Sequence, residues 1–270
     1  MKRAALLLAA ASLLAARAEA GPWATGRGRV YVKVSYDFLR STELAQPDGS
    51  VLPIPRFVHE EGALYVAYGV SERLTLIGFA PAWRSSDLQD FGRESGFGDL
   101  RFGAQWQLTR KGPWQIALRA LVQAPTGDET RAEGLLPTGT GVWEGEDVLS
   151  AGRSFAGGRG YGFAEAGYQW RGGGLRDGVV YGIQVGWNAT PRLVIAGNLR
   201  GVEPFSHAPR AEAFGAPVGF GDRVTYASYG PSAIFKLTRW IAAQLDVEDA
   251  FRTRNLATGA KLRVGIAFTK

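Results

Sequence analysis

Cysteine is absent from the 270 residues, and histidine occurs only twice. Without cysteine the chain forms no disulfide and offers no thiolate to a metal site or a nucleophilic site. The two histidines, His59 and His207, fall in or next to segments that we expect to be outer loops. Ser206 directly precedes His207, and adjacent side chains of an extended segment point to opposite faces, so the two do not form a catalytic pair. We therefore predict no catalytic residue, no metal site and no cofactor.

Long hydrophobic runs are missing beyond the first 20 residues, which excludes a transmembrane helix from the rest of the chain. The start of the chain is basic, and an apolar stretch, residues 4–16, precedes an Ala-Glu-Ala tripeptide that ends at Ala20. This order is typical of a secretory signal peptide, and the apolar stretch is too short to span a bilayer. We predict that residues 1–20 are a cleaved signal peptide and that residues 21–270 form one domain.

A large excess of one charge is also lacking. The chain has 31 basic and 25 acidic residues, and loss of the predicted signal peptide lowers the net charge from +6 to +4. Residues of both signs are spread along the chain, whereas nucleic-acid-binding proteins gather basic residues into a patch. We expect no nucleic-acid partner.

Glycine and aromatic residues are abundant, with 37 glycines, 8 tryptophans, 9 tyrosines and 14 phenylalanines. They occur in short segments in which apolar and polar residues alternate, and LRFGAQWQL at residues 100–108 is an example. Alternation with a period of two predicts β-strands with two different faces. The twelve predicted strands cover residues 30–38, 63–70, 74–83, 100–108, 114–123, 148–155, 164–171, 179–188, 193–200, 229–237, 241–248 and 260–268.

Two of these strands have an unclear register. Residues 74–83 are apolar on both faces, which leaves the inward face open. In residues 148–155, Arg153 and Phe155 share one face. We prefer the register that keeps Arg153 away from the apolar side of the sheet.

Short connections alternate with longer, more polar ones, as in outer-membrane barrels with their periplasmic turns and outer loops. An even number of antiparallel strands puts both chain ends on the side of the short turns. Only about eight residues lie between the signal peptide and the first strand, so we expect no long N-terminal plug. The short turns fall near residues 71–72, 109–113, 156–160, 189–192 and 238–239, and the long loops at 41–57, 84–96, 125–147, 172–178, 203–222 and 252–258.

The choice between a soluble and a membrane barrel rests on which face meets water. Twelve strands enclose more space than valine, leucine and alanine side chains fill, so an apolar interior would contain a costly void. Arg101 and Arg119 would each cost roughly 2–4 kcal/mol if they faced lipid at the membrane midplane. We predict an all-β fold: a twelve-stranded antiparallel up-and-down transmembrane β-barrel of outer-membrane type, with a polar lumen. Because lipid satisfies no free strand edge, the last strand must pair with the first.

Large aromatic residues of the apolar face lie near the strand ends, where the two membrane interfaces would be. In a soluble core they would concentrate at the middle of the strands. We predict two aromatic belts, made of Phe38, Trp106, Trp114, Trp170, Trp187, Tyr229, Phe235 and Phe268.

The polar face carries a mixed set of charges that we predict to line the pore. Rings of charge in an open lumen would tune ion or solute selectivity, and the basic excess predicts a mild preference for anions. The alternative is a narrow lumen plugged by salt bridges. The set consists of Lys33, Asp37, Arg101, Arg119, Glu165, Arg200, Lys236, Asp246, Glu248, Lys261 and Arg263.

The predicted loop at residues 125–147 is acidic, with a single arginine, Arg131. Several carboxylates can hold a divalent cation, which would bridge lipopolysaccharide, but their spacing matches no calcium-binding loop. A solvated outer loop is the simpler interpretation, and a loop folded into the lumen as a constriction is the third. The acidic residues are Asp128, Glu129, Glu133, Glu144, Glu146 and Asp147.

Five segments together resemble one protein family. They are YGVSERLTL (68–76), GFGDLRFGAQWQL (96–108), APTGD (124–128), GFAEAGYQW (162–170) and YGPSAIFKLT (229–238). In this order and spacing they resemble the outer-membrane proteins of the meta-pathway of phenol degradation family. The resemblance covers nearly the whole mature chain. It implies an outer-membrane barrel linked to uptake of aromatic or other small hydrophobic compounds, and it assigns no site residue.

The leading functional prediction is an outer-membrane channel or transporter for passive passage of small molecules. One alternative is a closed barrel with a structural or surface-interaction role carried by its outer loops. Another is a lipid-acting enzyme, for which the sequence offers no triad. The expected partners are outer-membrane lipid and lipopolysaccharide, small-molecule solutes, and the assembly machinery that reads C-terminal strands such as residues 260–268. The expected location is the bacterial outer membrane, reached through the periplasm.

Overall fold

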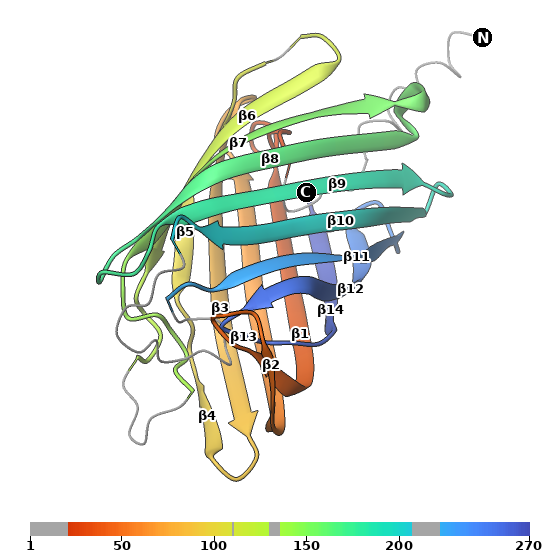
Figure 1. Cartoon of the computed structure of the whole chain (residues 1–270). Helices are drawn as coiled ribbons and strands as arrows, with labels where there is room; N and C mark the ends of the chain where they lie inside the picture. Colours follow the sequence, from red (N-terminus) through yellow and green to blue (C-terminus); the bar gives the residue numbers. More distant parts are fainter. Residues whose placement is uncertain (1–20, 110, 130–135, 207–221) are drawn as a thin grey trace, which may run out of the picture.

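The computed structural model describes residues 21–109, 111–129, 136–206 and 222–270, and this part of the chain is almost entirely β-strand (Figure 1). Its one helix is a 3₁₀ turn, Ala156–Gly158. None of the described residues forms a helix with the length and hydropathy of a membrane span. The strands are β1 (Val30–Ala45), β2 (Val51–Gly69), β3 (Leu74–Leu88), β4 (Gly92–Gly96), β5 (Leu100–Gln107), β6 (Trp114–Ala124), β7 (Glu144–Phe155), β8 (Gly160–Arg171), β9 (Gly178–Asn188), β10 (Leu193–Pro204), β11 (Thr225–Lys236), β12 (Ile241–Arg254), β13 (Leu256–Ala257) and β14 (Lys261–Thr269).

The strands form one antiparallel sheet that closes on itself, because β1 pairs with β2 on one side and with β14 on the other. β4 and β5 follow one another along β3, and β13 and β14 follow one another along β1. The fourteen strands therefore occupy twelve positions in the wall. The predicted twelve-stranded up-and-down barrel, closed between its last and first strands, is confirmed.

The two ends of the barrel differ in their connections. At one end, which we call the turn end, the strands are joined by short turns, and Val30 and Lys270 hydrogen-bond to each other through their backbones (2.9 Å). At the opposite end, the loop end, β2, β3 and β4 project beyond the rest of the wall (Figure 1). Much of what we predicted as outer loop is strand there, including residues 41–45, 51–57 and 84–88. A strand that extends beyond the membrane has water on both faces. Its sequence therefore need not alternate between apolar and polar residues, and the alternation pattern does not detect it.

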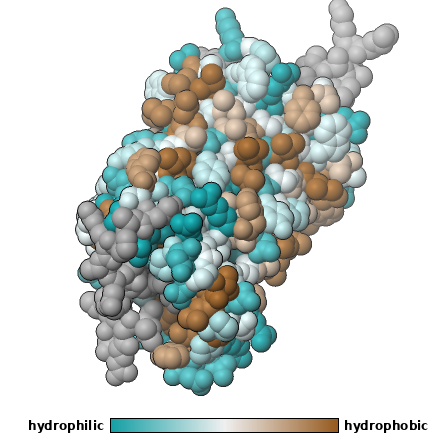
Figure 2. All heavy atoms as spheres, viewed as in Figure 1, coloured by the Kyte–Doolittle hydropathy of each residue, from teal (hydrophilic) through white to brown (hydrophobic). Residues whose placement is uncertain are grey.

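The two faces of the wall carry different side chains. In β1, Lys33 is 1% exposed and faces inward, whereas its neighbour Val34 is 60% exposed. The same contrast recurs in β9, where Ile183 is exposed and Gly182 is buried. Figure 2 shows hydrophobic side chains spread over the outside of the wall. The apolar face is therefore outside and the polar face lines the lumen, as predicted.

The strand registers left open by the sequence are resolved. In β3, Leu76 faces outward and Ile77 inward. In β7, Leu149 is exposed and Val148 buried, which puts Arg153 on the outer face and makes the preferred register wrong. Arg153 lies near the turn end, where its guanidinium stacks over the ring of Trp114 at 5.5 Å. A long arginine near a membrane interface keeps its charge in water, so it does not exclude an outward register.

Residues 21–25, in the segment that precedes β1, lie inside the barrel at the turn end, whereas residues 27–29 are exposed. The Gln107 side chain accepts a hydrogen bond from the Ala24 backbone N–H (2.8 Å), and the Gln105 amide donates to the Gly21 carbonyl (3.0 Å). The sequence analysis predicted no long plug and assigned this short segment no place in the lumen. The segment is short, but inward glutamines satisfy its backbone groups and hold it in the lumen.

Candidate functional site

An aromatic cluster fills the lumen at the turn end. The indole of Trp23, from the N-terminal segment, meets Tyr161 and Phe163 of β8 edge to face, with ring centroids 6.0 Å apart in each pair. Val194 and Ile234 complete the cluster from β10 and β11. Edge-to-face rings are a favourable aromatic arrangement, so these contacts fix the segment as well as fill space. The turn end is therefore narrowed by an apolar packing unit.

Ion pairs occupy the middle of the lumen. Each pair joins two neighbouring strands or two strands separated by a single strand. The pairs therefore run along the inner surface instead of bridging the lumen. Each partner offsets the cost of withdrawing the other from water. The pairs are Arg119 with Glu165 (3.2 Å), Arg200 with Glu248 (2.6 Å) and Arg263 with Asp37 (2.7 Å).

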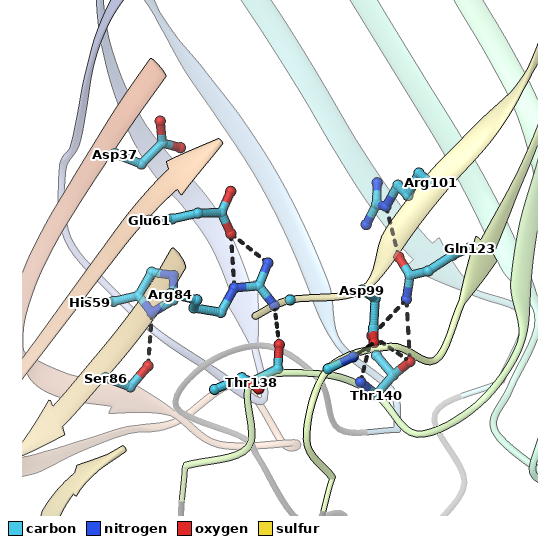
Figure 3. Close-up of polar contacts among 12 residues, drawn as sticks. Asp37, His59, Glu61, Arg84, Ser86, Asp99, Arg101, Gln123, Thr138 and Thr140 are labelled. Atoms are coloured by element: carbon cyan, nitrogen blue, oxygen red, sulfur yellow. Dashed lines mark hydrogen bonds and ion pairs between the residues drawn. The ribbon is translucent and has the colours of Figure 1, made fainter. Parts of the chain in front are cut away.

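Arg84 joins the wall to an inward-folded loop at the loop end (Figure 3). Its Nε donates to a carboxylate oxygen of Glu61 (2.8 Å), and its Nη1 donates to the Thr138 carbonyl (2.7 Å). β2 and β3 supply the two charged side chains, and Thr138 lies in the connection between β6 and β7. Charge-assisted bonds of this kind are stronger than neutral ones, so Arg84 pins the loop to the barrel wall.

Asp99, between β4 and β5, holds the same loop from a second side (Figure 3). Its side chain is buried, and its oxygens accept hydrogen bonds from the backbone N–H groups of Gly127 (2.9 Å) and Thr140 (2.6 Å). The Gln123 amide also donates to it (3.2 Å). Gly127 and Thr140 lie at the two ends of the β6–β7 connection, so one carboxylate fixes both.

In the β6–β7 connection, residues 136–139 are buried, whereas Asp128 and Glu129 are exposed and Glu133 lies outside the described residues. Leu136 is buried with Phe57, Leu88 and Ala257 in a small core at the loop end. Residues 136–139 therefore agree with a segment folded into the barrel, and Asp128 and Glu129 agree with the solvated interpretation. Several of its predicted acidic residues belong to β7 instead, and Glu144 forms an ion pair with Arg171 (2.9 Å). Within the described ranges, no group of three or more histidine, aspartate or glutamate residues could hold a metal ion.

Three cavities adjoin one another between the loop end and the middle of the lumen. The largest, about 370 Å³, shares Phe79, Arg84 and Arg101 with a second cavity of about 160 Å³. It shares Arg200 and Arg263 with a third of about 110 Å³. Because the walls are shared, the cavities form a series bounded by charged side chains. Charge and aromatic groups therefore meet any solute in this half of the lumen.

The structure places all eleven predicted lumen residues at inward strand positions. Eight of them line the three cavities. Arg119 lines none of these cavities but pairs with Glu165, which lines one. Lys33 and Lys236 line none of the three cavities. The eight are Asp37, Arg101, Glu165, Arg200, Asp246, Glu248, Lys261 and Arg263.

The sequence analysis missed several polar residues that line these cavities. Glu61 continues the inward alternation of β2 and could have been found by extending the strand. Arg84 could not have been found in this way. The β2–β3 pairing shifts register between Gly62 and Ala63, and the shift changes which β3 residues face inward. Glu144 and Glu146 were assigned to the acidic loop instead of the lumen, whereas Asp99 and Arg171, which also line a cavity, lie on the polar face that the sequence predicts to face the lumen.

His59 was expected in or next to an outer loop and instead lies within β2, facing the lumen. Its Nδ1 is 2.8 Å from the Ser86 hydroxyl, and its ring stacks on Phe57. The position is explained by the extension of β2 beyond its predicted start. His207 lies outside the described residues.

Most of the predicted belt aromatics are exposed on the outer surface, although Phe38 and Trp170 are half-buried. At the turn end, arginines stack on tryptophans, with Arg159 5.2 Å from the Trp187 ring and Arg239 4.7 Å from Trp240. Cation–π contacts of this kind keep a charge beside an apolar surface. The exposed belt residues are Trp106, Trp114, Trp187, Tyr229, Phe235 and Phe268.

Solved structures with this architecture are outer-membrane barrels. The crystal structure of an outer membrane channel from Pseudomonas putida F1 superposes with a TM-score of 0.73 at 17% identity, covering 94% of this chain and all of that one. The KdgM porin follows with a TM-score of 0.54 at 7% identity (88% and 98% covered). The translocator domain of autotransporter NalP from Neisseria meningitidis gives 0.51 at 9% (99% and 95% covered). At these identities the likeness concerns the fold.

Sequence comparison defines the family. No curated protein matches the chain. The model of the family described as "Putative MetA-pathway of phenol degradation" matches residues 50–264, which run from the start of β2 into β14. The chain therefore belongs to this family, as the five sequence segments predicted.

Proposed function

We propose that the protein is an outer-membrane channel for passive passage of small molecules. The observation that carries this proposal is the series of adjoining cavities whose ion pairs run along the wall. Salt bridges that crossed the lumen would plug it, whereas pairs along the wall leave its centre open to water. Charged groups in such a lumen select solutes by sign, size and hydrogen bonding. No covalent step is required of any residue.

A closed barrel that acts through its outer loops is the second candidate. It is favoured by the turn end, where residues 21–25 and the aromatic cluster occupy the lumen. The two candidates therefore make opposite statements about the same segment. In a channel it narrows the path, and in a closed barrel it seals the path.

Conductance separates the candidates. The mature chain would be refolded in detergent, its folding checked by heat-modifiable gel mobility, and the protein inserted into a planar bilayer under a potassium chloride gradient. We expect steady single-channel steps and a small reversal potential. A heat-modifiable barrel that inserts but carries no current would overturn the channel and support the closed barrel.

The location and partners follow from the same proposal. The outward apolar face, with aromatic residues at both ends, supports placement in the bacterial outer membrane in contact with lipid and lipopolysaccharide. The family description supports aromatic solutes. Fractionation of expressing cells tests the location, since recovery in the inner-membrane or soluble fraction would contradict it. Uptake of phenol into liposomes containing the barrel tests the solute.

A further inference from the structure

The turn end of the barrel carries a ring of positive charge. Each of the five short turns contains a described cationic residue, and the stretches before β1 and after β14 add three more. Among the described residues of these turns and stretches, Glu72 has the only side-chain carboxylate. The turn end therefore has an excess of one sign that the modest net charge of the chain conceals. The cations of the turns are Arg73, Lys111, Arg159, Arg192 and Arg239.

The charge of this ring is not neutralised by the protein. Within the described residues, no ion pair joins one of its cations to a carboxylate. Exposed arginines of the loop end differ, since Arg93 is 3.5 Å from Glu60 and Arg252 is 3.1 Å from Glu203. The turn end can therefore attract an anion from outside the protein.

Part of the ring lies on exposed aromatic residues of the outer face, over β6 to β9. The Arg153 guanidinium is 5.5 Å from the Trp114 ring, and the Arg159 guanidinium is 5.2 Å from the Trp187 ring. Phe155 follows Arg153 on the same face of β7, and its ring is 6.3 Å from that of Trp187. All five side chains are exposed. We call these five residues the turn-end patch.

The two guanidinium groups of the patch keep donors for another partner. A guanidinium that stacks on a ring through its face leaves the N–H groups at its edge unused. Neither Arg153 nor Arg159 donates a side-chain hydrogen bond to another described residue. The indoles therefore hold the two charges in place without satisfying their hydrogen bonds.

An apolar wall continues from the patch toward the middle of the barrel. Leu118 of β6, Leu149 of β7 and Val185 of β9 are exposed on the same outer face. In an outer-membrane barrel this face contacts acyl chains, and the aromatic belt at its edge lies at the level of the headgroups. The patch therefore puts cations where the surface for acyl chains ends.

This combination selects among classes of partner. An acidic peptide or polysaccharide would bind the cations but would leave the apolar wall uncovered. A zwitterionic lipid would cover the wall, but its headgroup would bring a further cation to a surface that already has an excess of them. A phospholipid with a net negative headgroup satisfies both parts, because phosphate oxygens accept charge-assisted hydrogen bonds from arginine.

We infer that the turn-end patch binds anionic phospholipid, with headgroup phosphate on Arg153 and Arg159 and acyl chains along β6 to β9. The two guanidinium groups are independent contacts, each able to take the phosphate of one lipid. The inference rests on the proposed outer-membrane location, in which the turn end lies in the leaflet that faces the periplasm. It goes beyond the proposed channel, since passage of solutes requires no particular lipid.

The test is native mass spectrometry of the refolded mature chain in a neutral detergent. Phosphatidylglycerol and phosphatidylcholine with identical acyl chains are added in separate titrations, and the fraction of protein that retains lipid is measured. We expect phosphatidylglycerol to bind about fivefold or more tightly, since one basic side chain near an anionic surface contributes about that factor. Equal affinity for the two lipids would overturn the inference.

A double variant locates the site. Arg153→Gln with Arg159→Gln should weaken phosphatidylglycerol binding about fivefold and leave phosphatidylcholine binding unchanged. The matched control, Arg56→Gln with Arg252→Gln, removes the same charge from exposed arginines of the loop end and should bind like the parent protein. If the two double variants bind phosphatidylglycerol alike, the patch does not hold the lipid.

Folding of each variant is checked by heat-modifiable mobility. If the patch double variant misfolds, the two single variants decide, and each should lose about half of the bound phosphatidylglycerol because one of two independent contacts remains. Single variants that lose none would refute the site. Oligoglutamate, which has the charge without acyl chains, should not displace the lipid at equal concentration. Displacement would contradict a lipid site and favour an acidic protein partner.

Lipid binding and conductance fail independently. A barrel that carries potassium chloride current but shows no preference for phosphatidylglycerol refutes the lipid site and leaves the channel intact. A barrel that prefers phosphatidylglycerol but carries no current refutes the channel and retains the lipid site.

Discussion

The two halves of the lumen differ in what occupies them. At the turn end, residues 21–25 and the Trp23 cluster fill space with apolar packing and amide hydrogen bonds. At the loop end, cavities remain, and their walls are lined by charges. In the proposed channel, the first arrangement would exclude solutes by size, and the second would discriminate among them by charge. The comparison predicts that the steric barrier and the selective one can be altered separately.

Deletion of residues 21–25 should produce the largest effect. The wall is unchanged because β1 begins at Val30, but the turn end loses Trp23 and the backbone groups bound by Gln105 and Gln107. We expect single-channel conductance to rise several-fold in a planar bilayer, because the lumen at the turn end is widened. Unchanged conductance would show that the steric barrier is elsewhere.

Asp99→Ala should damage the loop end and leave the turn end intact. The change leaves the N–H groups of Gly127 and Thr140 without their acceptor in a buried site. We expect the free energy of unfolding to fall by about 3 kcal/mol, measured by urea titration in detergent. Hydrogen exchange of residues 136–140 should accelerate. Equal acceleration at Trp23 would mean that the two halves are coupled.

Arg84→Gln should have a smaller effect on the same loop. Glu61 would lose its closest partner, and the Thr138 carbonyl would lose one donor, while Asp99 still holds the loop. We expect about 2 kcal/mol of destabilisation and more frequent brief closures of the single-channel current. The double variant Glu61→Gln with Arg84→Gln should recover part of the stability, because it removes the unpaired charge. If the double variant is less stable than Arg84→Gln, the unpaired charge of Glu61 is not what destabilises the single variant.

Arg101→Gln should have the smallest effect, a shift of a few millivolts in the reversal potential toward cation preference. Arg101 adds positive charge to the cavity because its nearest carboxylate is 4.0 Å away. The matched control is Arg119→Gln combined with Glu165→Gln, which removes one charge of each sign from a close pair and should leave the reversal potential unchanged. Equal shifts in both proteins would contradict the distinction between paired and available charges.

The membrane wall could be predicted from the sequence, because lipid on one side and water on the other force alternation. Residues 100–108 show this, since the predicted inward and outward faces are those of β5. The loop end could not be predicted, because the extensions of β2 and β3 meet water on both faces. The inward position of Arg84 depends on a register shift between β2 and β3. Asp99 lies in an irregular link between β4 and β5, and its hydrogen bonds to the loop depend on the path of that link. The N-terminal segment shows no periodicity, and only the inward glutamines that bind it make it part of the lumen.

Around the wall, neighbouring strands are also consecutive in the chain, with one exception. The exception is the seam between β1 and β14, where Asp37 and Arg263 form a bidentate ion pair across 226 residues. Closing this seam costs more chain entropy than closing any hairpin of the wall. A chain truncated before β14 would leave strand edges that lipid cannot satisfy. The seam therefore makes the stability of the whole wall depend on the last strand of the barrel.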